Sequence, residues 1–197
     1  MSYLVILGCI LMAYLIGSIP TGYILVKLVK GIDIRTIGSG STGATNVKRV
    51  LGLKGFIITM LLDGLKGIIP VFAVRELVPV SWLAPVVATM IIIGHSKSIF
   101  LHFTGGKSVA SGAGTIIGLN PLAGLFTFLI WFVLTYTTKY VSVGSIVALS
   151  LAPIWMFLLH APTSYILYCA IGAIYVIYLH RENIKRLLKG EENKVRS

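Results

Sequence analysis

Carboxylate side chains are scarce in this sequence, which has six Asp and Glu residues against 17 Lys and Arg. Charged residues make up 12% of its 197 positions, about half the share found in an average soluble domain. An enzyme that relies on a paired carboxylic acid and carboxylate is therefore disfavoured, because few carboxylates can fill the two roles. No His, Cys, Asp and Glu residues cluster at metal-ligand spacing, so we expect neither a metal nor another cofactor.

Cysteine, histidine and aspartate patterns exclude further classes. The two cysteines, Cys9 and Cys169, lie in apolar runs, where packing is favoured over a disulfide or a metal bond. None of the four histidines has an Asp five positions further on, so the HxxxxD motif of one acyltransferase class is missing. The grouped aspartates that mark alcohol phosphotransferases are missing as well.

Apolar residues are abundant, at 56% of the chain, and they form long uncharged runs. A membrane-spanning helix needs about 20 such residues, or fewer where protein shields it. We therefore predict an all-α integral membrane protein, a single polytopic domain over residues 1–197 with seven transmembrane helices. The expected spans are about 3–26 (broken by Gly17, Pro20 and Gly22), 55–74, 81–94, 109–119, from the turn at 120–121 to 137, 145–159, and from the turn at 160–162 to 179.

Basic residues fix the expected orientation of these spans. All but two of the 17 Lys and Arg fall in alternate connections or in the C-terminal tail. Positive charge is retained on the cytoplasmic side, so we expect the N-terminus outside and the C-terminus in the cytoplasm. The basic surplus then serves orientation and contact with anionic membrane lipid, and we expect no nucleic-acid partner. The predicted cytoplasmic active-site loops are about 27–54, 95–108, 138–145 and 180–197.

The first of these loops contains the segment GSGSTGATN, residues 38–46, with Arg35 before it and Arg49 after it. Glycines let several backbone N–H groups turn toward one point, and a helix start beside basic side chains binds phosphate. The segment formally matches the dinucleotide pattern GxGxxG, but no strand precedes it, and Ala44 occupies the lysine position of a phosphate-binding Walker loop. A flexible connection between spans is the alternative interpretation.

Three more segments carry polar groups beside apolar spans. In the second loop Gly105-Gly106 precedes Lys107, which combines close backbone approach with a mobile positive charge. His180 and Asn183 share one face of a helical tail, which could equally lie on anionic lipid. Inside the second span Asp63 and Lys66 are three residues apart, so we expect them to pair and to face protein.

These segments resemble the PlsY-type acyl-phosphate glycerol-3-phosphate acyltransferases of bacteria. Three blocks carry the resemblance: GSGSTGATNVKRVLG from Gly38, GHSKSIFLHFTGGKSVASGAG from Gly94, and HRENIKRLLKGEE from His180. Their order and expected cytoplasmic placement match as well. Ser108 occupies a position where the family has Gly after the lysine.

The resemblance implies transfer of a fatty acyl group from acyl phosphate to the 1-hydroxyl of glycerol 3-phosphate. Lysophosphatidate and inorganic phosphate would form in the first step of phospholipid synthesis, in the bacterial inner membrane, with the site facing the cytoplasm and a monomer as the expected form. The general base stays open between His180 and a phosphate oxygen of the donor. The expected catalytic residues are Lys107, Ser145, His180 and Asn183, and the expected substrate-binding residues are Ser39, Gly40, Ser41, Gly43, Thr45, Asn46, Arg49, Gly105 and Gly106.

A membrane transporter or channel for phosphate or other anions is the alternative from another class. Basic, glycine-rich loops on one side of a membrane would also suit anion entry. The short outer turns carry almost no polar residues for a second gate, which favours the enzyme.

Overall fold

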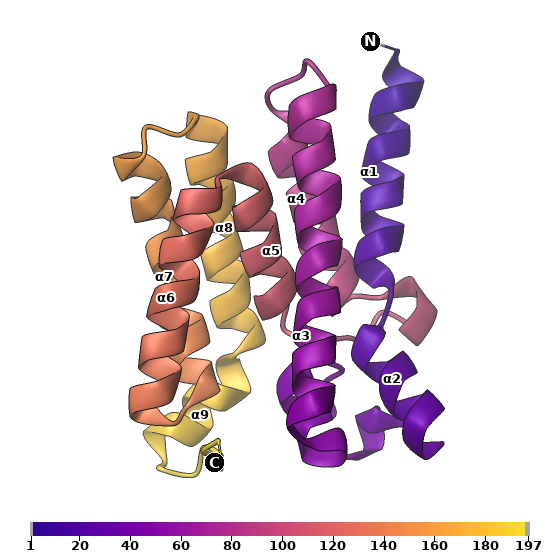
Figure 1. Cartoon of the computed structure of the whole chain (residues 1–197), viewed down its shortest axis with the longest axis vertical. Helices are drawn as coiled ribbons and strands as arrows, with labels where there is room; N and C mark the ends of the chain where they lie inside the picture. Colours follow the sequence, from indigo (N-terminus) through magenta and orange to yellow (C-terminus); the bar gives the residue numbers. More distant parts are fainter. Residues whose placement is uncertain (1, 196–197) are drawn as a thin grey trace.

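The computed structural model describes residues 2–195, which fold as a bundle of helices with no named strand among them. Figure 1 shows the helices running mostly along one axis, with the two chain termini at opposite ends of the bundle. The elements are α1 (Tyr3–Ser18), α2 (Thr21–Lys30), η1 (Ile34–Thr36), α3 (Ala44–Leu77), α4 (Leu83–Ser96), η2 (Ile99–Leu101), α5 (Val109–Leu119), α6 (Pro121–Thr138), α7 (Val141–Leu158), α8 (Thr163–Leu179) and α9 (Arg181–Leu188).

Apolar helices long enough to cross a membrane dominate the described chain. Four stretches qualify, residues 3–30, 44–77, 121–138 and 141–158, and a fifth forms if α8 and α9 are taken together across a 60° bend. Helices α4 and α5 are apolar but shorter. The expectation of a multi-pass, all-helical membrane protein is therefore confirmed.

Several element boundaries differ from the sequence-based expectation. The expected break in the first span is confirmed at Pro20: α1 ends at Ser18 and α2 begins at Thr21, while the two helices together form one apolar stretch over residues 3–30. The expected 27–54 loop is mostly helical at its end, since α3 already begins at Ala44 and continues across Gly52, whose φ of 69° makes a kink. Helix α7 begins at Val141 rather than at 145. Hydropathy locates the apolar part of a helix, not the polar turns that extend it.

Helix α5 lies at the centre of the bundle, between α3 and α4 on one side and α6, α7 and α8 on the other (Figure 1). Its approach to α3 depends on small residues: a Cβ on Gly67 would lie 2.4 Å from the carbonyl oxygen of Ser111. A Cβ on Gly114 would lie 2.2 Å from the carbonyl oxygen of Gly64. Small residues at such contacts let helix backbones approach closely inside a membrane.

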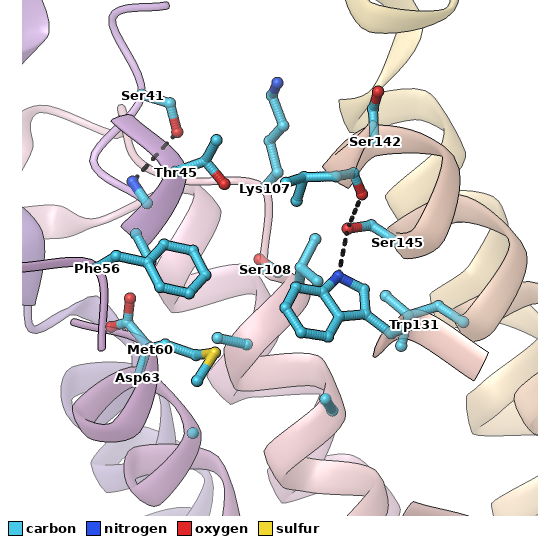
Figure 2. Close-up of a pocket in the computed structure, with 18 of the residues that line it drawn as sticks. Ser41, Thr45, Phe56, Met60, Asp63, Lys107, Ser108, Trp131, Ser142 and Ser145 are labelled. Atoms are coloured by element: carbon cyan, nitrogen blue, oxygen red, sulfur yellow. Dashed lines mark hydrogen bonds between the residues drawn. The ribbon is translucent and has the colours of Figure 1, made fainter. Parts of the chain in front are cut away.

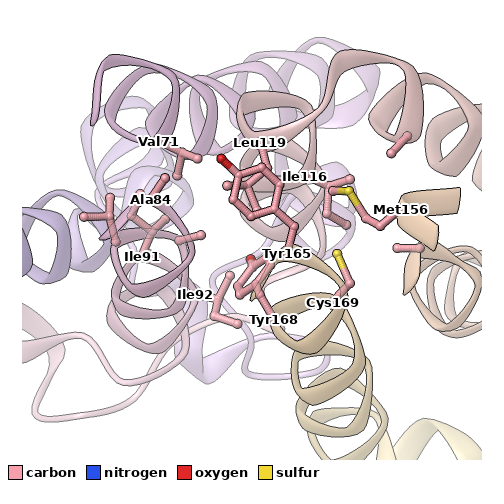
Figure 3. Packing of buried hydrophobic residues seen from close by; sticks show 14 of the residues in the cluster. Val71, Ala84, Ile91, Ile92, Ile116, Leu119, Met156, Tyr165, Tyr168 and Cys169 are labelled. Carbon is pink, nitrogen blue, oxygen red and sulfur yellow. The ribbon is translucent and has the colours of Figure 1, made fainter. Parts of the chain in front are cut away.

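The apolar core gathers where α3, α4, α5, α7 and α8 meet. Figure 3 shows Ile116 and Leu119 of α5 beside Met156 of α7 and the two rings of Tyr165 and Tyr168 on α8. The polar end of Tyr168 is satisfied by a hydrogen bond with the Thr115 hydroxyl. This core fixes α5, and the residues that precede α5 form one wall of the site described next.

Candidate functional site

A cavity of about 310 Å³ opens between α3 and α5 on one side and α6 and α7 on the other. One end is polar and is formed by the loop before α3, the start of α5, and α9 with the tail that follows it. The other end is apolar: Figure 2 shows Phe56 and Met60 of α3 on the opposite side of the cavity from Trp131 of α6. A cavity with a few polar groups on an apolar wall is the usual form of a small-molecule site.

Ten of the thirteen residues predicted for the site line this cavity, although they come from four separate segments of the chain. Gly40, Gly105 and Gly106 do not line it. The ten that do are Ser39, Ser41, Gly43, Thr45, Asn46, Arg49, Lys107, Ser145, His180 and Asn183.

Asn46 shapes the loop before α3 from inside. Its Nδ2 lies 2.9 Å from the carbonyl oxygens of both Ile37 and Ser41, while its Oδ1 lies 3.3 Å from the backbone nitrogen of Ser39. The residue is 2% exposed, so both polar ends of its amide are already occupied by the loop. Positive φ values at Gly38 and Gly40 allow the loop to wrap around this side chain.

Two helix N-termini point toward the polar end of the cavity. Helix α3 begins after Gly43, with Thr45 in its first turn and Arg49 one turn further, where Nη1 of Arg49 donates to Oδ1 of Asn46 at 3.3 Å. Helix α5 begins after Ser108, which adopts a left-handed φ of 57° that glycine takes more readily. The Ser108 hydroxyl donates to the carbonyl oxygen of Ile92 at 2.7 Å. Free N–H groups and the helix dipole favour an anion at both positions.

Lys107 connects the start of α5 to α9. Its Nζ donates a short hydrogen bond to Oδ1 of Asn183. Burial lowers the pKa of Lys107 to about 8, and repulsion from Arg186 and Arg49 adds to the decrease while Glu192 opposes it. The ammonium group is therefore mostly protonated at neutral pH and loses its proton as the pH rises through about 8.

Glu192 was not predicted for the site, yet it organises the tail around it. Its Oε1 accepts hydrogen bonds from Nδ2 of Asn183 at 2.6 Å and from the Ser142 hydroxyl at 2.9 Å. Its Oε2 lies 2.7 Å from Nε of Arg186. Burial alone would raise the pKa of this carboxyl, but these donors hold it below its ordinary value. By fixing Nδ2 of Asn183, Glu192 leaves the Oδ1 atom to face Lys107.

His180 is 3% exposed and is held by its own helix. Its Nδ1 lies 2.8 Å from the carbonyl oxygen of Val176, which makes Nδ1 the protonated nitrogen and leaves Nε2 as an acceptor. Burial lowers the pKa of His180 to about 4, although the hydrogen bond with Val176 acts in the opposite direction. The ring is therefore neutral at physiological pH and is a weak base.

Ser145 lies at the boundary between the polar and apolar ends of the cavity. Its hydroxyl donates to the carbonyl oxygen of Val141 at 2.7 Å and lies 3.3 Å from Nε1 of Trp131, as Figure 2 shows. The side chain is buried, so the indole ring and the hydroxyl are fixed relative to each other. Sequence reasoning missed Trp131, because a tryptophan in an apolar run has the pattern of an ordinary span residue.

Gly105 and Gly106 have a different environment from the one expected. A Cβ on Gly105 would lie 2.2 Å from the carbonyl oxygen of His95, and a Cβ on Gly106 would lie 2.2 Å from Nε2 of the same residue. The two glycines therefore allow the chain to pass close over His95. They shape the turn before Lys107, whereas their predicted role in binding a substrate stays a prediction.

The expected pair within the second span is confirmed. Nζ of Lys66 lies 2.8 Å from Oδ1 of Asp63, and both side chains are almost fully buried. Lys66 also donates to the carbonyl oxygen of Ile19, where α1 ends. Among the described residues no group of three or more His, Cys, Asp and Glu is arranged to hold a metal ion.

The fold and the cavity together define a multi-pass membrane protein in which a polar pocket end with Lys107 and Arg49 is continuous with an apolar chamber. Residues 7–190 match the family model described as glycerol-3-phosphate acyltransferase, so the chain belongs to the glycerol-3-phosphate acyltransferase family.

Relatives and solved structures agree with this assignment. The glycerol-3-phosphate acyltransferases of Rippkaea orientalis and of a Nostoc species are each 45% identical to this chain; both alignments cover 94% of it, and 91% and 90% of the respective relatives. The crystal structure of PlsY, an integral membrane glycerol 3-phosphate acyltransferase, in its glycerol 3-phosphate form superposes with a TM-score of 0.92 at 38% identity, covering 97% of this chain and 96% of that one. Its lysophosphatidic acid form superposes with a TM-score of 0.89.

Replacing Glu192 by Gln should weaken the packing of the tail against α7 and α9 and so destabilise the protein. The change removes the charge that pairs with Arg186 and replaces one acceptor oxygen by a donor, so one of the hydrogen bonds from Asn183, Ser142 or Arg186 is lost. We expect the apparent melting temperature in detergent to fall by about 5 °C. The neighbouring Glu191→Gln, at an exposed position, is the matched control and should melt like wild type. Equal melting of both variants would contradict the role of Glu192.

Proposed function

We propose that this protein transfers a fatty acyl group from acyl phosphate to the 1-hydroxyl of glycerol 3-phosphate, giving lysophosphatidate and inorganic phosphate. The observation that carries the proposal is a single cavity that joins an anion site to an apolar chamber. An acyl phosphate needs both environments at once, because its phosphate is charged and its chain is apolar. The related PlsY structures contain glycerol 3-phosphate and lysophosphatidic acid, which supports the acceptor and the product.

The donor's acyl chain would lie between α3 and α6. Met60 and Leu61 line this chamber on α3, and Phe128 and Trp131 line it on α6. Leu61 and Phe128 are also 55% and 42% exposed, so the chamber wall continues onto the surface that faces lipid. A donor that is dissolved in the membrane would therefore enter sideways, and the acylated product would leave in the same way.

The phosphate groups would occupy the polar end. In our proposal the loop before α3 holds the donor phosphate through Ser39, Thr45 and the free N–H groups of the helix start. Glycerol 3-phosphate would lie against Lys107, Arg49 and the acceptor Nε2 of His180. Charge-assisted hydrogen bonds from Lys and Arg to a phosphate are about twice as strong as neutral ones. Asn183 and Ser145 complete the set that orients the glycerol.

The reaction then needs little from the protein beyond placement and charge. The 1-hydroxyl oxygen attacks the acyl carbonyl carbon, and the bond from that carbon to the phosphate oxygen breaks. The hydroxyl proton leaves with the phosphate. His180, with its lowered pKa, suits a hydrogen-bond acceptor that aligns the hydroxyl better than a base that removes its proton. We therefore favour a donor phosphate oxygen as the proton acceptor, and proximity and electrostatic stabilisation supply the rate.

We infer that the protein crosses the bacterial inner membrane seven times and acts as a monomer. The apolar helices would be α1, α3, α4, α5, α6, α7 and α8, with α2 and α9 near the cytoplasmic surface. The termini lie at opposite ends of the bundle, as an odd number of crossings requires (Figure 1). The end that carries α9 and the loop before α3 also carries most Lys and Arg, which favours a cytoplasmic site and C-terminus. All groups used here come from one chain, so a monomer suffices.

The test is phosphate release by the purified protein with glycerol 3-phosphate and palmitoyl phosphate, palmitoyl-CoA or no donor. We expect release that depends on both glycerol 3-phosphate and palmitoyl phosphate, with lysophosphatidate as product. Product from palmitoyl-CoA alone would overturn the donor. If folded protein forms no product with either donor but carries labelled phosphate across liposomes, the protein is a transporter and the proposal is wrong.

The pH dependence of glycerol 3-phosphate binding should follow Lys107. Because its pKa is about 8, the ammonium group is charged below that pH and loses its proton above it. We expect the KM for glycerol 3-phosphate to rise about tenfold per pH unit above 8, and the KM of Lys107→Met to be high throughout, with no such rise. Wild-type KM that stays flat up to pH 9.5 would contradict the role of Lys107. The exposed Lys189→Met should behave like wild type.

A further inference from the structure

The turn that presents Lys107 lies directly on the last turn of α4. The backbone nitrogen of Gly106 donates to the carbonyl oxygen of His95 at 3.1 Å. On the other side of Lys107, the Ser108 hydroxyl donates to the carbonyl oxygen of Ile92 at 2.7 Å. Residues 105–108 therefore follow the shape of α4 and have little freedom of their own.

The imidazole ring of His95 is wedged between this turn and α3. Its Nδ1 lies 3.7 Å from Oδ1 of Asp63, which is too far for a hydrogen bond but close enough for packing contact. The opposite nitrogen, Nε2, faces Gly106, since a Cβ there would lie 2.2 Å from it and 3.0 Å from Cδ2. The ring thus separates a buried carboxylate from the backbone of the turn, and its thickness determines how far the turn lies from α3.

Asp63 is itself fixed at the junction of three helices. It pairs with Lys66 on its own helix, and Lys66 donates at 2.9 Å to the carbonyl oxygen of Ile19 just beyond α1. The side chain of His95 is 6% exposed and that of Asp63 is 2% exposed, so neither ring nor carboxylate can easily move. These contacts join the end of α1, α3 and α4 at one buried point, so they favour a single arrangement of the three helices.

We propose that His95, supported by Asp63, is a positioning residue: it sets the distance between α3 and the turn at residues 105–108, and thereby the position of Lys107 in the cavity. The proposal rests on the proposed function, because Lys107 is taken to bind glycerol 3-phosphate. A displacement of about 1 Å at such a group can reduce the rate about 100-fold. The ring and the carboxylate also border the cavity, so a role in direct contact with substrate has to be distinguished from positioning.

A double-mutant cycle between positions 95 and 106 makes this distinction. Gly106→Ala puts a methyl group where the His95 ring lies, so it should displace the turn and lower kcat/KM for glycerol 3-phosphate about 100-fold. His95→Ala removes the ring and should lower kcat/KM about tenfold, mainly by raising the KM for glycerol 3-phosphate while the KM for acyl phosphate changes little. The double variant should be no worse than His95→Ala alone, because the new methyl group occupies the vacated space.

Gly105→Ala is the matched control for this cycle. Its Cβ would meet the carbonyl oxygen of His95 and the backbone of Ser96, which remain when the ring is removed. Its loss of activity should therefore be the same in the wild-type and His95→Ala backgrounds. A second cycle with His95→Gln, which keeps a polar side chain, serves if His95→Ala does not fold.

The outcomes are decisive in both directions. Rescue of Gly106→Ala, but not of Gly105→Ala, by removal of the ring supports the proposal. Losses at 95 and 106 that multiply, a Gly106→Ala variant within twofold of wild type, or rescue of both glycine variants would overturn it. The same cycle can be measured by melting temperature, which detects the contact between the ring and position 106 without an activity assay. An inactive wild-type protein would reject the proposed function, while the melting temperatures would still show whether the contact exists.

Discussion

The hydrogen bond from Lys107 to Asn183 joins two segments that are 76 residues apart, and the polar end of the site depends on it. The residues on either side of Lys107 donate hydrogen bonds to the last turns of α4, which fixes the backbone at residues 105–108. Asn183 is held from the other side by Glu192 and the tail. The cation therefore has a defined place before any substrate arrives, and this preorganisation lets a fixed charge act without reorganisation during the reaction.

The scarcity of carboxylates takes on a chemical meaning in this arrangement. Among the described residues, the cavity is lined by only two carboxylates, Asp63 and Glu192, and each is committed to a cation. Neither is arranged as a free base, and His180 is kept neutral by its burial. In the proposed reaction the donor carries its own leaving phosphate and so needs no strong base from the protein, which would leave the electropositive end free to bind the phosphates of both substrates.

Most of the fold could be predicted from the sequence, because long apolar runs identify membrane-spanning helices and basic connections indicate their orientation. Most of the predicted cavity residues could also be identified, since glycine, hydroxyl and basic residues stand out between apolar segments. Glu192, Trp131 and the positioning role that we propose for His95 could not. A glutamate in a basic tail, a tryptophan in a span and a histidine at a helix end have no local signal, and each acts through partners more than ten residues away in the chain or on another element. The glycine pair at 105–106 was recognised from the sequence, but the reason for it was not. A glycine can serve ligand binding, a turn or close packing, and only the structure shows that these two pack against His95.

The most direct test of the account is a structure determined with a non-hydrolysable acyl phosphonate and glycerol 3-phosphate bound together. The account predicts the acyl chain between α3 and α6, against Phe56 and Trp131, with the phosphonate at the start of α3 and the glycerol phosphate beside Lys107. The 1-hydroxyl should lie about 3–3.5 Å from the carbonyl carbon of the analogue, in which the bridging oxygen of acyl phosphate is absent. An acyl chain bound elsewhere, or a glycerol phosphate out of reach of Lys107, would contradict it.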